Sequence, residues 1–315
     1  MVTALVQAQL EKVIKHTKND HSPVTIADYA TQAYIGKALA DFEPNALLAA
    51  EEDTTSLKRQ GDTRLLIGIQ EALQPVWSSA SIQDIIGAID LGTHDALSTR
   101  FWTLDPIDGT KGFLRGGQYA ISLALIEDGE VTCGVLGCPN LSSDFSRPFD
   151  DPDPFGNLYF ATSSTGTRSL QIGQELEDAK PVRASTDIEI QNIRICESIE
   201  AAHSNFSDSA KISANIGTRG KPARLDSQCK YAVVARGQAE AYIRSPAQRS
   251  YEEKIWDHAA GTIVAQQAGA TVSDLHGKKL DFNHGRTLKQ NQGILCVSEE
   301  HHTRLIDVIT KLDLV

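Results

Sequence analysis

The sequence predicts a chain that mixes helices with strands, in two domains or one large one. Its 315 residues exceed the size at which a single hydrophobic core usually splits. Two strands in the middle of the chain are joined by Asp128-Gly129, which is a strong hairpin signal. After Lys180-Pro181 the pattern changes to short strands that alternate with helices. We therefore expect a domain boundary near residues 184–190, which gives domains 1–187 and 188–315.

The elements of the first part follow from apolar periodicity and from chain breakers. Ser22-Pro23 separates two helical patterns, and a segment rich in proline and aspartate forms a surface loop. In chain order we expect helices over 4–16 and 25–42, mixed helix and loop over 60–100, strands over 101–104, 119–127 and 131–136, a loop over 142–157, and a strand over 157–162.

In the second part, short apolar runs indicate strands and longer periodic runs indicate helices. We expect strands over 193–197, 231–236 and 240–244, a helix over 255–268, strands near 271 and 294, and a closing helix over 299–312.

The composition limits the partners. Thirty basic residues against 41 acidic ones give a net charge of -11, which argues against a nucleic-acid backbone or an anionic membrane as the main partner. For an anionic substrate, cations must then come from a local cluster or from bound metal. No apolar run approaches the ~18 residues of a membrane span, and no basic stretch leads into an apolar one at the N-terminus. Together with five scattered cysteines without a CxxC pair, this predicts a reducing, cytoplasmic or nuclear location.

The most informative stretch runs from Leu104 to Thr110, with the sequence LDPIDGT. Asp105 and Asp108 straddle a proline at the exit of an apolar strand, so a tight turn can bring both carboxylates and the intervening carbonyl together. Magnesium prefers such hard oxygen ligands. Gly109 and Thr110 follow at an expected helix N-terminus, where free N–H groups favour a phosphate. A plain Asp-Pro turn is the alternative, and the apolar lead-in and the full run to Gly-Thr favour the metal.

Three further acids are candidates, each with a structural alternative. Glu51 follows the apolar run 46–50 and could belong to a solvated charge pair. Asp257, within WDHAAG, could stabilise a helix N-terminus. Asp28 lies three residues after Thr25, in an arrangement that resembles a capping box with Asp in place of Glu. His258 and the other histidines show no ligand spacing, so zinc is not expected.

Together these acids resemble the lithium-sensitive, magnesium-dependent phosphatase superfamily that includes inositol monophosphatase and fructose-1,6-bisphosphatase. The hallmarks match as Glu51-Glu52, 105–110 and 256–261, in the family's order. The segment Lys111–Gly116 (KGFLRG) is similar to the 3'(2'),5'-bisphosphate nucleotidase branch, in its longer fungal and plant form. Blocks 22–32 (SPVTIADYATQ), 225–235 (LDSQCKYAVVA) and 251–261 (YEEKIWDHAAG) match the same branch, so the resemblance covers almost the whole chain.

The resemblance implies a layered α-β-α-β-α sandwich, with an α+β N-terminal domain and a smaller α/β C-terminal domain. It implies two or three Mg²⁺ ions held by Glu51, Asp105, the carbonyl of Ile107, Asp108 and Asp257, with Asp28 and Thr110 orienting and deprotonating the attacking water. The residues implied in substrate binding are Asp108, Thr110, His203, Ser227, Lys230, Arg244 and Asp257. Lys230 and Arg244 would supply local positive charge on an acidic protein.

The implied reaction is hydrolysis of the 3'-phosphate of 3'-phosphoadenosine 5'-phosphate by in-line attack of a metal-activated water, which gives AMP and phosphate. Activity on the 5'-phosphosulfate relative and a place in sulfur assimilation belong to the same expectation. An inositol (poly)phosphate 1-phosphatase is the alternative, disfavoured by 111–116 and Lys230. A non-catalytic nucleotide or salt-sensing module is the alternative of another class. The sequence leaves the oligomeric state open.

Two departures from the family pattern carry expectations of their own. Ala50 stands where a glycine usually precedes the glutamate pair, which would shift Glu51 if that position needs a positive φ. The N-terminus is short, so the first helix is expected to begin a few turns late and to pack more weakly.

Overall fold

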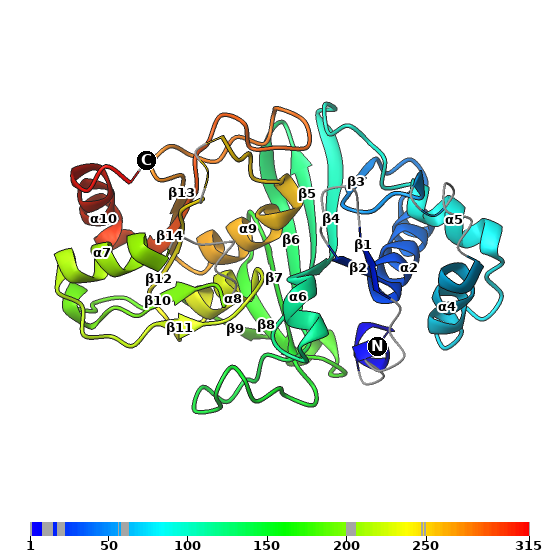
Figure 1. The fold of residues 1–315 in the computed structure, drawn as a ribbon, viewed down its shortest axis with the longest axis horizontal. Coiled ribbons are helices and arrows are strands. Elements are labelled where there is room, and N and C mark those ends of the chain that lie inside the picture. The colour runs from blue at the N-terminus through cyan, green and yellow to red at the C-terminus, as the bar shows by residue number, and fades with distance from the viewer. Residues whose placement is uncertain are drawn as a thin grey trace.

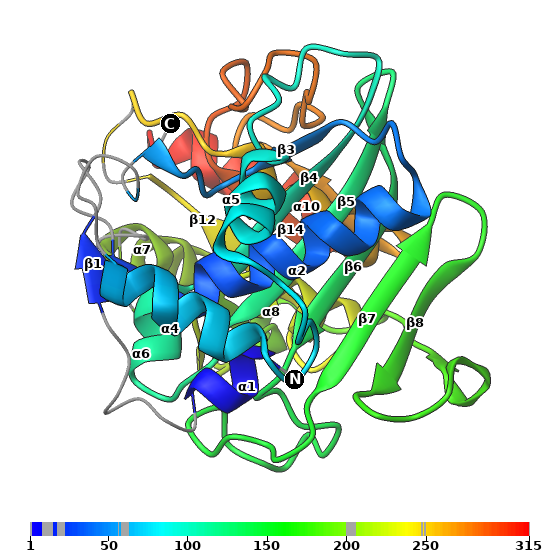
Figure 2. The same cartoon turned by 90° about the vertical axis from the view of Figure 1, so that its right-hand side faces the viewer.

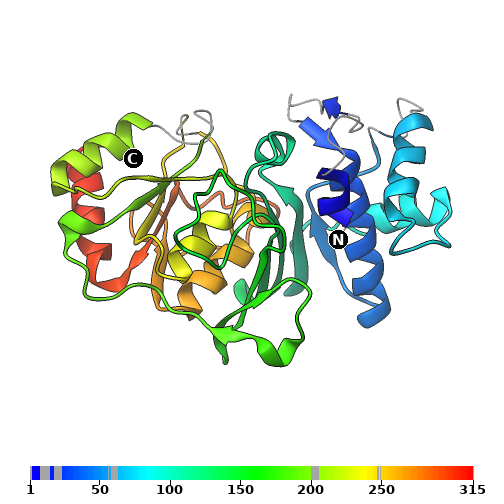
Figure 3. The same cartoon turned by 90° about the horizontal axis from the view of Figure 1, so that it is seen from below.

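The computed structural model describes residues 2–7, 15–17, 23–55, 57, 63–199, 206–246, 248 and 250–314. Two large β-sheets alternate with three layers of helices (Figures 1 and 3). This is the layered α-β-α-β-α arrangement that the resemblance implied.

The larger sheet is built from the first part of the chain and has seven strands in the order β3-β4-β5-β6-β7-β8-β9. They are β3 (Leu48–Ala50), β4 (Arg100–Asp108), β5 (Ala120–Glu127), β6 (Glu130–Cys138), β7 (Asn157–Thr162), β8 (Gly166–Gln171) and β9 (Lys180–Pro181). β5 and β6 form the expected hairpin, because Asp128 and Gly129 take the positive φ angles of 49° and 77° that a type I′ turn needs.

Helices α2 (Ile26–Phe42), α4 (Thr63–Leu73) and α5 (Ile82–Asp90) cover the outer face of this sheet (Figure 2). The expected second helix is therefore confirmed as α2. The expected first helix is confirmed only as α1 (Val2–Gln7). At its other end the prediction was wrong, because Lys15–Thr17 is a short strand, β1, which pairs with β2 (Pro23–Thr25). Residues 8–14 lie outside the described part.

The smaller sheet is built from the second part of the chain and has the order β11-β10-β12-β14-β13. Its strands are β10 (Ile195–Glu197), β11 (Ala223–Arg224), β12 (Ala241–Arg244), β13 (Ala270–Ser273) and β14 (Ile294–Ser298). Helices α7 (Phe206–Ile216) and α10 (Glu299–Lys311) lie on its outer side (Figure 1). α8 (Cys229–Ala235) and α9 (Ala259–Gln267) fill the space between the two sheets.

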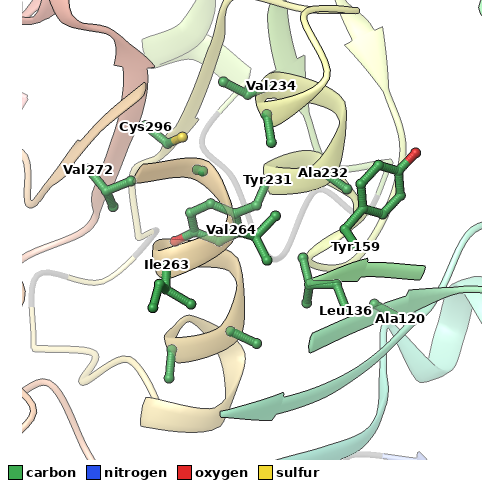
Figure 4. Close-up of a cluster of buried hydrophobic side chains, with 14 of the residues drawn as sticks. Ala120, Leu136, Tyr159, Tyr231, Ala232, Val234, Ile263, Val264, Val272 and Cys296 are labelled. Carbon is green, nitrogen blue, oxygen red and sulfur yellow. The ribbon is translucent and has the colours of Figure 1, made fainter. Parts of the chain in front are cut away.

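This middle helical layer forms the main core. Figure 4 shows Tyr231 of α8 and Ile263 of α9 between Leu136 of the larger sheet and Val272 of the smaller one. The strand expected over 231–236 was wrong. Every residue of α8 is buried, and the run 231–235 lacks charged residues, so its sequence shows no helical period. Because both sheets pack on one core, the domain boundary at 187/188 stays a prediction.

Within the described ranges, no helix is both long enough and apolar enough to cross a lipid bilayer. All five cysteines are free, as their scattered spacing predicted.

Candidate active site

Two of the predicted acids leave neighbouring strands at the same edge of the larger sheet. β3 runs parallel to β4 with Ala50 opposite Leu104, so Glu51 and Asp105 emerge side by side. The Glu51 N–H donates to the Leu104 carbonyl at 3.1 Å, which fixes the backbone at this point. Ala50 lies within the extended strand β3 and is buried, so the position does not require glycine. The substitution at this position therefore does not displace Glu51.

Asp105 and Asp108 converge through a β-bulge. β4 continues to Asp108, but its register against β5 shifts between the two aspartates. Pro106 has no N–H to give to the sheet, which is tolerated at such an irregularity. The Ile107 N–H donates to Asp105 Oδ1 at 3.0 Å, and the Thr110 hydroxyl donates to the Ile107 carbonyl at 3.2 Å.

The expected helix does follow this bulge. Gly109 has a φ of +85° and forms the N-cap of α6 (Thr110–Leu114). An added Cβ at Gly109 would lie 3.0 Å from the Ser227 Cβ, so glycine is needed for its conformation and for this close approach. α6 is only five residues long and begins at Thr110, two positions after Asp108.

Asp257 comes from the second part of the chain. It ends the 3₁₀ turn η4 (Ile255–Asp257), and His258 caps α9. The Gln228 amide holds this turn, since its Nε2 donates to the Trp256 carbonyl at 2.8 Å and its Oε1 accepts from the Gly261 N–H at 3.0 Å. The Gln228 backbone N–H donates to Asp108 Oδ2. Gln228 therefore links Asp108 to the turn that carries Asp257, two predicted ligands from distant parts of the sequence.

The electrostatics show that the acids lie together. Burial raises the pKa of Asp105 well above its usual value, and the charges of Glu51, Asp108 and Asp257 raise it further, with a smaller effect from Asp28. Asp257 has a pKa raised well above its usual value for the same reasons: first burial, then Asp108 and Glu51 among its acidic neighbours. Burial also raises the pKa of Asp108 to about 6. Such a set of buried and half-buried oxygens fits a divalent cation, which would supply the missing positive charge.

Asp28 does form the capping box that was its structural alternative. Its Oδ2 accepts from both the Thr25 N–H and the Thr25 hydroxyl at 2.7 Å, and the Thr25 hydroxyl accepts from the Asp28 N–H at 3.4 Å. The effect of Asp28 on the Asp105 pKa nevertheless places it beside the acids. The two roles are compatible, and a catalytic role stays a prediction.

The two predicted cations have different surroundings. Lys230 is buried, 5.2 Å above the Tyr242 ring, and its Nζ donates to the Leu225 carbonyl at 3.4 Å. Burial lowers the pKa of Lys230, while the Asp108 carboxylate opposes this shift. Arg244 forms an ion pair with Glu253 at 2.7 Å and lies 4.0 Å from Asp257.

A buried chain of polar groups holds Arg244. Glu253 accepts from the Arg244 Nε at 2.8 Å and contacts the His258 ring at 3.1 Å, and the Tyr231 hydroxyl contacts the other His258 nitrogen at 3.0 Å. Ligand atoms of Glu253, Asp257 and His258 lie within 4.8 Å of one another. However, Glu253 and His258 are already engaged, which makes this group a scaffold for Arg244 and Asp257.

The remaining predicted residues are placed as follows. Ser227 lies at a positive φ of 67°, and its Oγ accepts from the Cys229 N–H at 3.2 Å. His203 lies outside the described residues. Arg115 and Asp226 form an ion pair, which brings the KGFLRG segment against the LDSQ segment. Two branch-typical motifs therefore meet beside the acids.

Two glutamines were not recognised as part of the site, although both stand in quoted motifs. Gln32 donates from Nε2 to the Glu52 carbonyl at 2.6 Å and accepts from the Glu52 N–H at 3.0 Å. It therefore fixes the glutamate pair from the helix that carries Asp28. Gln228 performs the same task for Asp108 and the Asp257 turn. Their place inside blocks that match the nucleotidase branch was the available signal, and the structure shows both to be buried, where amides need partners.

Comparison with known proteins agrees with this geometry. The model of the inositol monophosphatase family matches residues 2–313, and the chain belongs to that family. Among solved structures, the IMPase of Thermotoga maritima superposes with a TM-score of 0.65 at 19% identity, covering 100% of this chain and 95% of that one. An IMPase/NADP phosphatase complexed with Mg²⁺ and phosphate superposes with a TM-score of 0.61 at 16% identity, covering 98% of this chain and 90% of that one. These likenesses confirm the fold.

Curated relatives make the similarity more specific. A 3'(2'),5'-bisphosphate nucleotidase of Schizosaccharomyces pombe is 40% identical over 303 residues, which cover 92% of this chain and 84% of that protein. The resemblance read from the sequence is thereby confirmed.

Proposed function

We propose that this protein is a divalent-metal-dependent 3'(2'),5'-bisphosphate nucleotidase that removes the 3'-phosphate of 3'-phosphoadenosine 5'-phosphate. The observation that carries the proposal is the group of four carboxylates in which the pKa values of Asp105, Asp108 and Asp257 are raised by burial and by neighbouring acids, set beside the buried Lys230. The identity to curated nucleotidases over most of the chain supports the substrate class. The 5'-phosphosulfate relative, which shares the 3'-phosphate, is proposed as a second substrate.

The donor set fits magnesium. Glu51, Asp105, Asp108 and Asp257 offer hard oxygens, and the Ile107 carbonyl lies between two of them. Four carboxylates balance the charge of two Mg²⁺ ions, and a substrate phosphate would support a third. When bound, the metal would lower the pKa of a water and neutralise charge on the phosphoryl group.

The protein's own groups would position the reactants. Asp28 and Thr110 stand next to the acids, where a carboxylate and a hydroxyl can accept and relay the proton of an attacking water. Asp108 and Asp257, with Ser227, Lys230, Arg244 and His203, would hold the nucleotide. Lys230 would pair with a phosphate oxygen, because its charge is buried close to Asp108.

The test is phosphate release in Mg²⁺ from 3'-phosphoadenosine 5'-phosphate and, separately, from inositol 1-phosphate. The proposal expects turnover of the bisphosphate to exceed that of inositol 1-phosphate by a wide margin. A preference for inositol 1-phosphate would instead support the inositol phosphatase alternative. No release from either, by folded and metal-loaded protein, would support a non-catalytic nucleotide-binding or salt-sensing module.

A further inference from the structure

Arg286 lies in the irregular segment between β13 and β14, next to the turn that carries Asp257. The backbones pair here: the Ile255 N–H donates to the Arg286 carbonyl at 3.3 Å, and the Leu288 N–H donates to the Glu253 carbonyl at 2.8 Å. A bridge between Lys254 and Thr287 continues this pairing. Any displacement of Arg286 would therefore be transmitted to the Asp257 turn.

The Arg286 side chain reaches across to the larger sheet. Its Nη1 donates to the Gly92 carbonyl at 3.2 Å and to the His94 carbonyl at 2.7 Å, and its Nη2 donates to the Ala50 carbonyl. Ala50 immediately precedes Glu51. The segment at Gly92 is itself bonded to β3, since the Ala50 N–H donates to the Gly92 carbonyl at 2.8 Å. The Arg286 guanidinium therefore holds the end of β3 from which Glu51 emerges.

The same guanidinium lies over the Trp256 ring, with its Cζ 4.6 Å from the ring centroid. Trp256 immediately precedes Asp257. A planar group that donates several hydrogen bonds at its edge and stacks through its face is the special capacity of arginine, and lysine cannot reproduce it.

We propose that Arg286 is a positioning residue that sets the spacing between Glu51 and Asp257 in the divalent-metal site. The inference rests on the proposed function. It assigns to Arg286 the role that outer-shell partners have in metal sites, which is to orient ligands without touching the ion. Gln32 and Gln228 hold Glu51 and Asp257 within their own neighbourhoods, whereas Arg286 links the two neighbourhoods directly.

An electrostatic role and a positioning role for Arg286 predict opposite effects on metal binding when the Arg286 charge is removed. The Arg286 charge interacts with the carboxylates of Asp53 and Asp95 and, more weakly, with that of Glu51, so it competes with a bound metal for the Glu51 charge. On electrostatic grounds alone, Arg286→Met would strengthen metal binding. If Arg286 instead holds the ligands in place, the same change weakens metal binding. The sign of the effect separates the two accounts.

Arg236 provides a matched control elsewhere in the molecule. Arg236 is buried, its Nη1 donates to the Ser142 carbonyl at 2.6 Å, and its Cζ lies 4.6 Å from the Phe145 ring centroid. Both of these partners belong to the loop after β6, which contains no proposed ligand. Arg236→Lys and Arg286→Lys therefore remove the same kind of interaction, but only the second is beside the metal site.

The experiment is calorimetric titration of the metal-stripped full chain with Mn²⁺, together with thermal unfolding. We expect Arg286→Met and Arg286→Lys to raise the Kd for Mn²⁺ by ~10-fold, at the lower end of the range for outer-shell residues. Arg236→Lys should lower the melting temperature and leave the Kd within about twofold of wild type. Excess Mg²⁺ should restore turnover of the bisphosphate in the Arg286 variants.

Each other outcome overturns the inference. An unchanged or lower Kd in Arg286→Met would show that Arg286 does not position the ligands, and Arg286→Lys decides the question if the methionine variant does not fold. Equal weakening by Arg236→Lys would reduce the effect to general loss of stability. Failure of the wild-type protein to bind Mn²⁺ is a separate result, since it contradicts the metal site of the proposed function.

Discussion

The two parts of the site are held in different ways. In the first part of the chain, backbone geometry places the acids: a parallel strand pair places Glu51 next to Asp105, and a bulge brings Asp108 to them. In the second part, side-chain networks place the groups: Gln228 fixes the Asp257 turn, and Glu253 fixes Arg244.

The two parts of the chain also contribute different kinds of side chain to the site. Most of the proposed metal ligands come from the first part, and both cations proposed to bind substrate, Lys230 and Arg244, come from the second. We infer that the first part determines whether the reaction occurs and that the second part determines which phosphate ester is accepted. Substitutions of ligands in the first part should therefore abolish turnover, whereas substitutions of Lys230 and Arg244 in the second part should have graded effects that depend on the substrate.

The largest effect is expected for Asp108→Asn. The substitution removes one negative charge from the metal site but keeps the shape of the side chain, and the amide oxygen can still accept from the Gln228 N–H. Turnover should be abolished while the circular dichroism spectrum stays that of wild type. Substantial turnover by the folded variant would show that Asp108 is not a metal ligand.

Asp28→Asn separates catalysis from capping. As a positioned general base, Asp28 should contribute ~10²–10⁴-fold to turnover. As a cap alone, it should contribute only roughly 1 kcal/mol to the free energy of unfolding. Because the capping box is present, we expect both losses, measured by steady-state kinetics and by urea unfolding. A stability loss without a kinetic loss would leave Asp28 as a cap.

Lys230→Met tests the substrate-binding role of the second part. The KM for the bisphosphate should rise by ~10–100-fold, which corresponds to the loss of a charged hydrogen bond worth about 1.5–3 kcal/mol. A substrate that carries only the 3'-phosphate should be affected less if Lys230 contacts the 5'-phosphate. Equal losses on both substrates would place Lys230 at the metal site instead.

Arg244→Met should behave differently because Arg244 has an internal partner. Its loss leaves Glu253 buried without a counter-charge beside His258, which should destabilise the fold by about 3–5 kcal/mol. The double change Arg244→Met with Glu253→Gln should recover much of that stability. A KM defect that persists in the stabilised double variant would assign Arg244 to nucleotide binding, and its disappearance would assign Arg244 to the scaffold.

The smallest expected effect is partial inhibition by lithium. Four carboxylates are largely neutralised by their first Mg²⁺ ions, so the last ion is held loosely, and Li⁺ accepts the same ligands with half the charge. Lithium should lower turnover more than it raises KM, and extra magnesium should relieve it only in part. Potassium chloride at equal ionic strength controls for screening. Indistinguishable rates in the two salts would reject this model of the site.

Local sequence signals predicted the parts of the fold that depend on local structure. The hairpin at Asp128-Gly129 and the start of α2 at Ile26 follow from turn and capping residues. The strand β8 was missed, because Gly166–Gln171 (GTRSLQ) has one large apolar residue and no apolar–polar alternation in its sequence. α8 was mistaken for a strand, because both of its sides face a sheet and no polar side reveals its period.

The site could be predicted as far as its motifs extend. Asp105 and Asp108 are neighbours in sequence, so their chemistry is visible before folding. Arg286 has no such signal: its partners Ala50, Gly92 and Trp256 are distant along the chain, and only the tertiary structure brings them together. The pairing of Arg244 with Glu253 was likewise not foreseen, although both stand in segments that were singled out.

The most direct test of the central claim is metal removal. Protein stripped by exhaustive chelation, with its metal content verified, is assayed for phosphate release from 3'-phosphoadenosine 5'-phosphate before and after Mg²⁺ is restored. The clustered carboxylates of Glu51, Asp105, Asp108 and Asp257 predict no release without metal and full recovery with Mg²⁺. Undiminished release from verified metal-free protein would contradict the account.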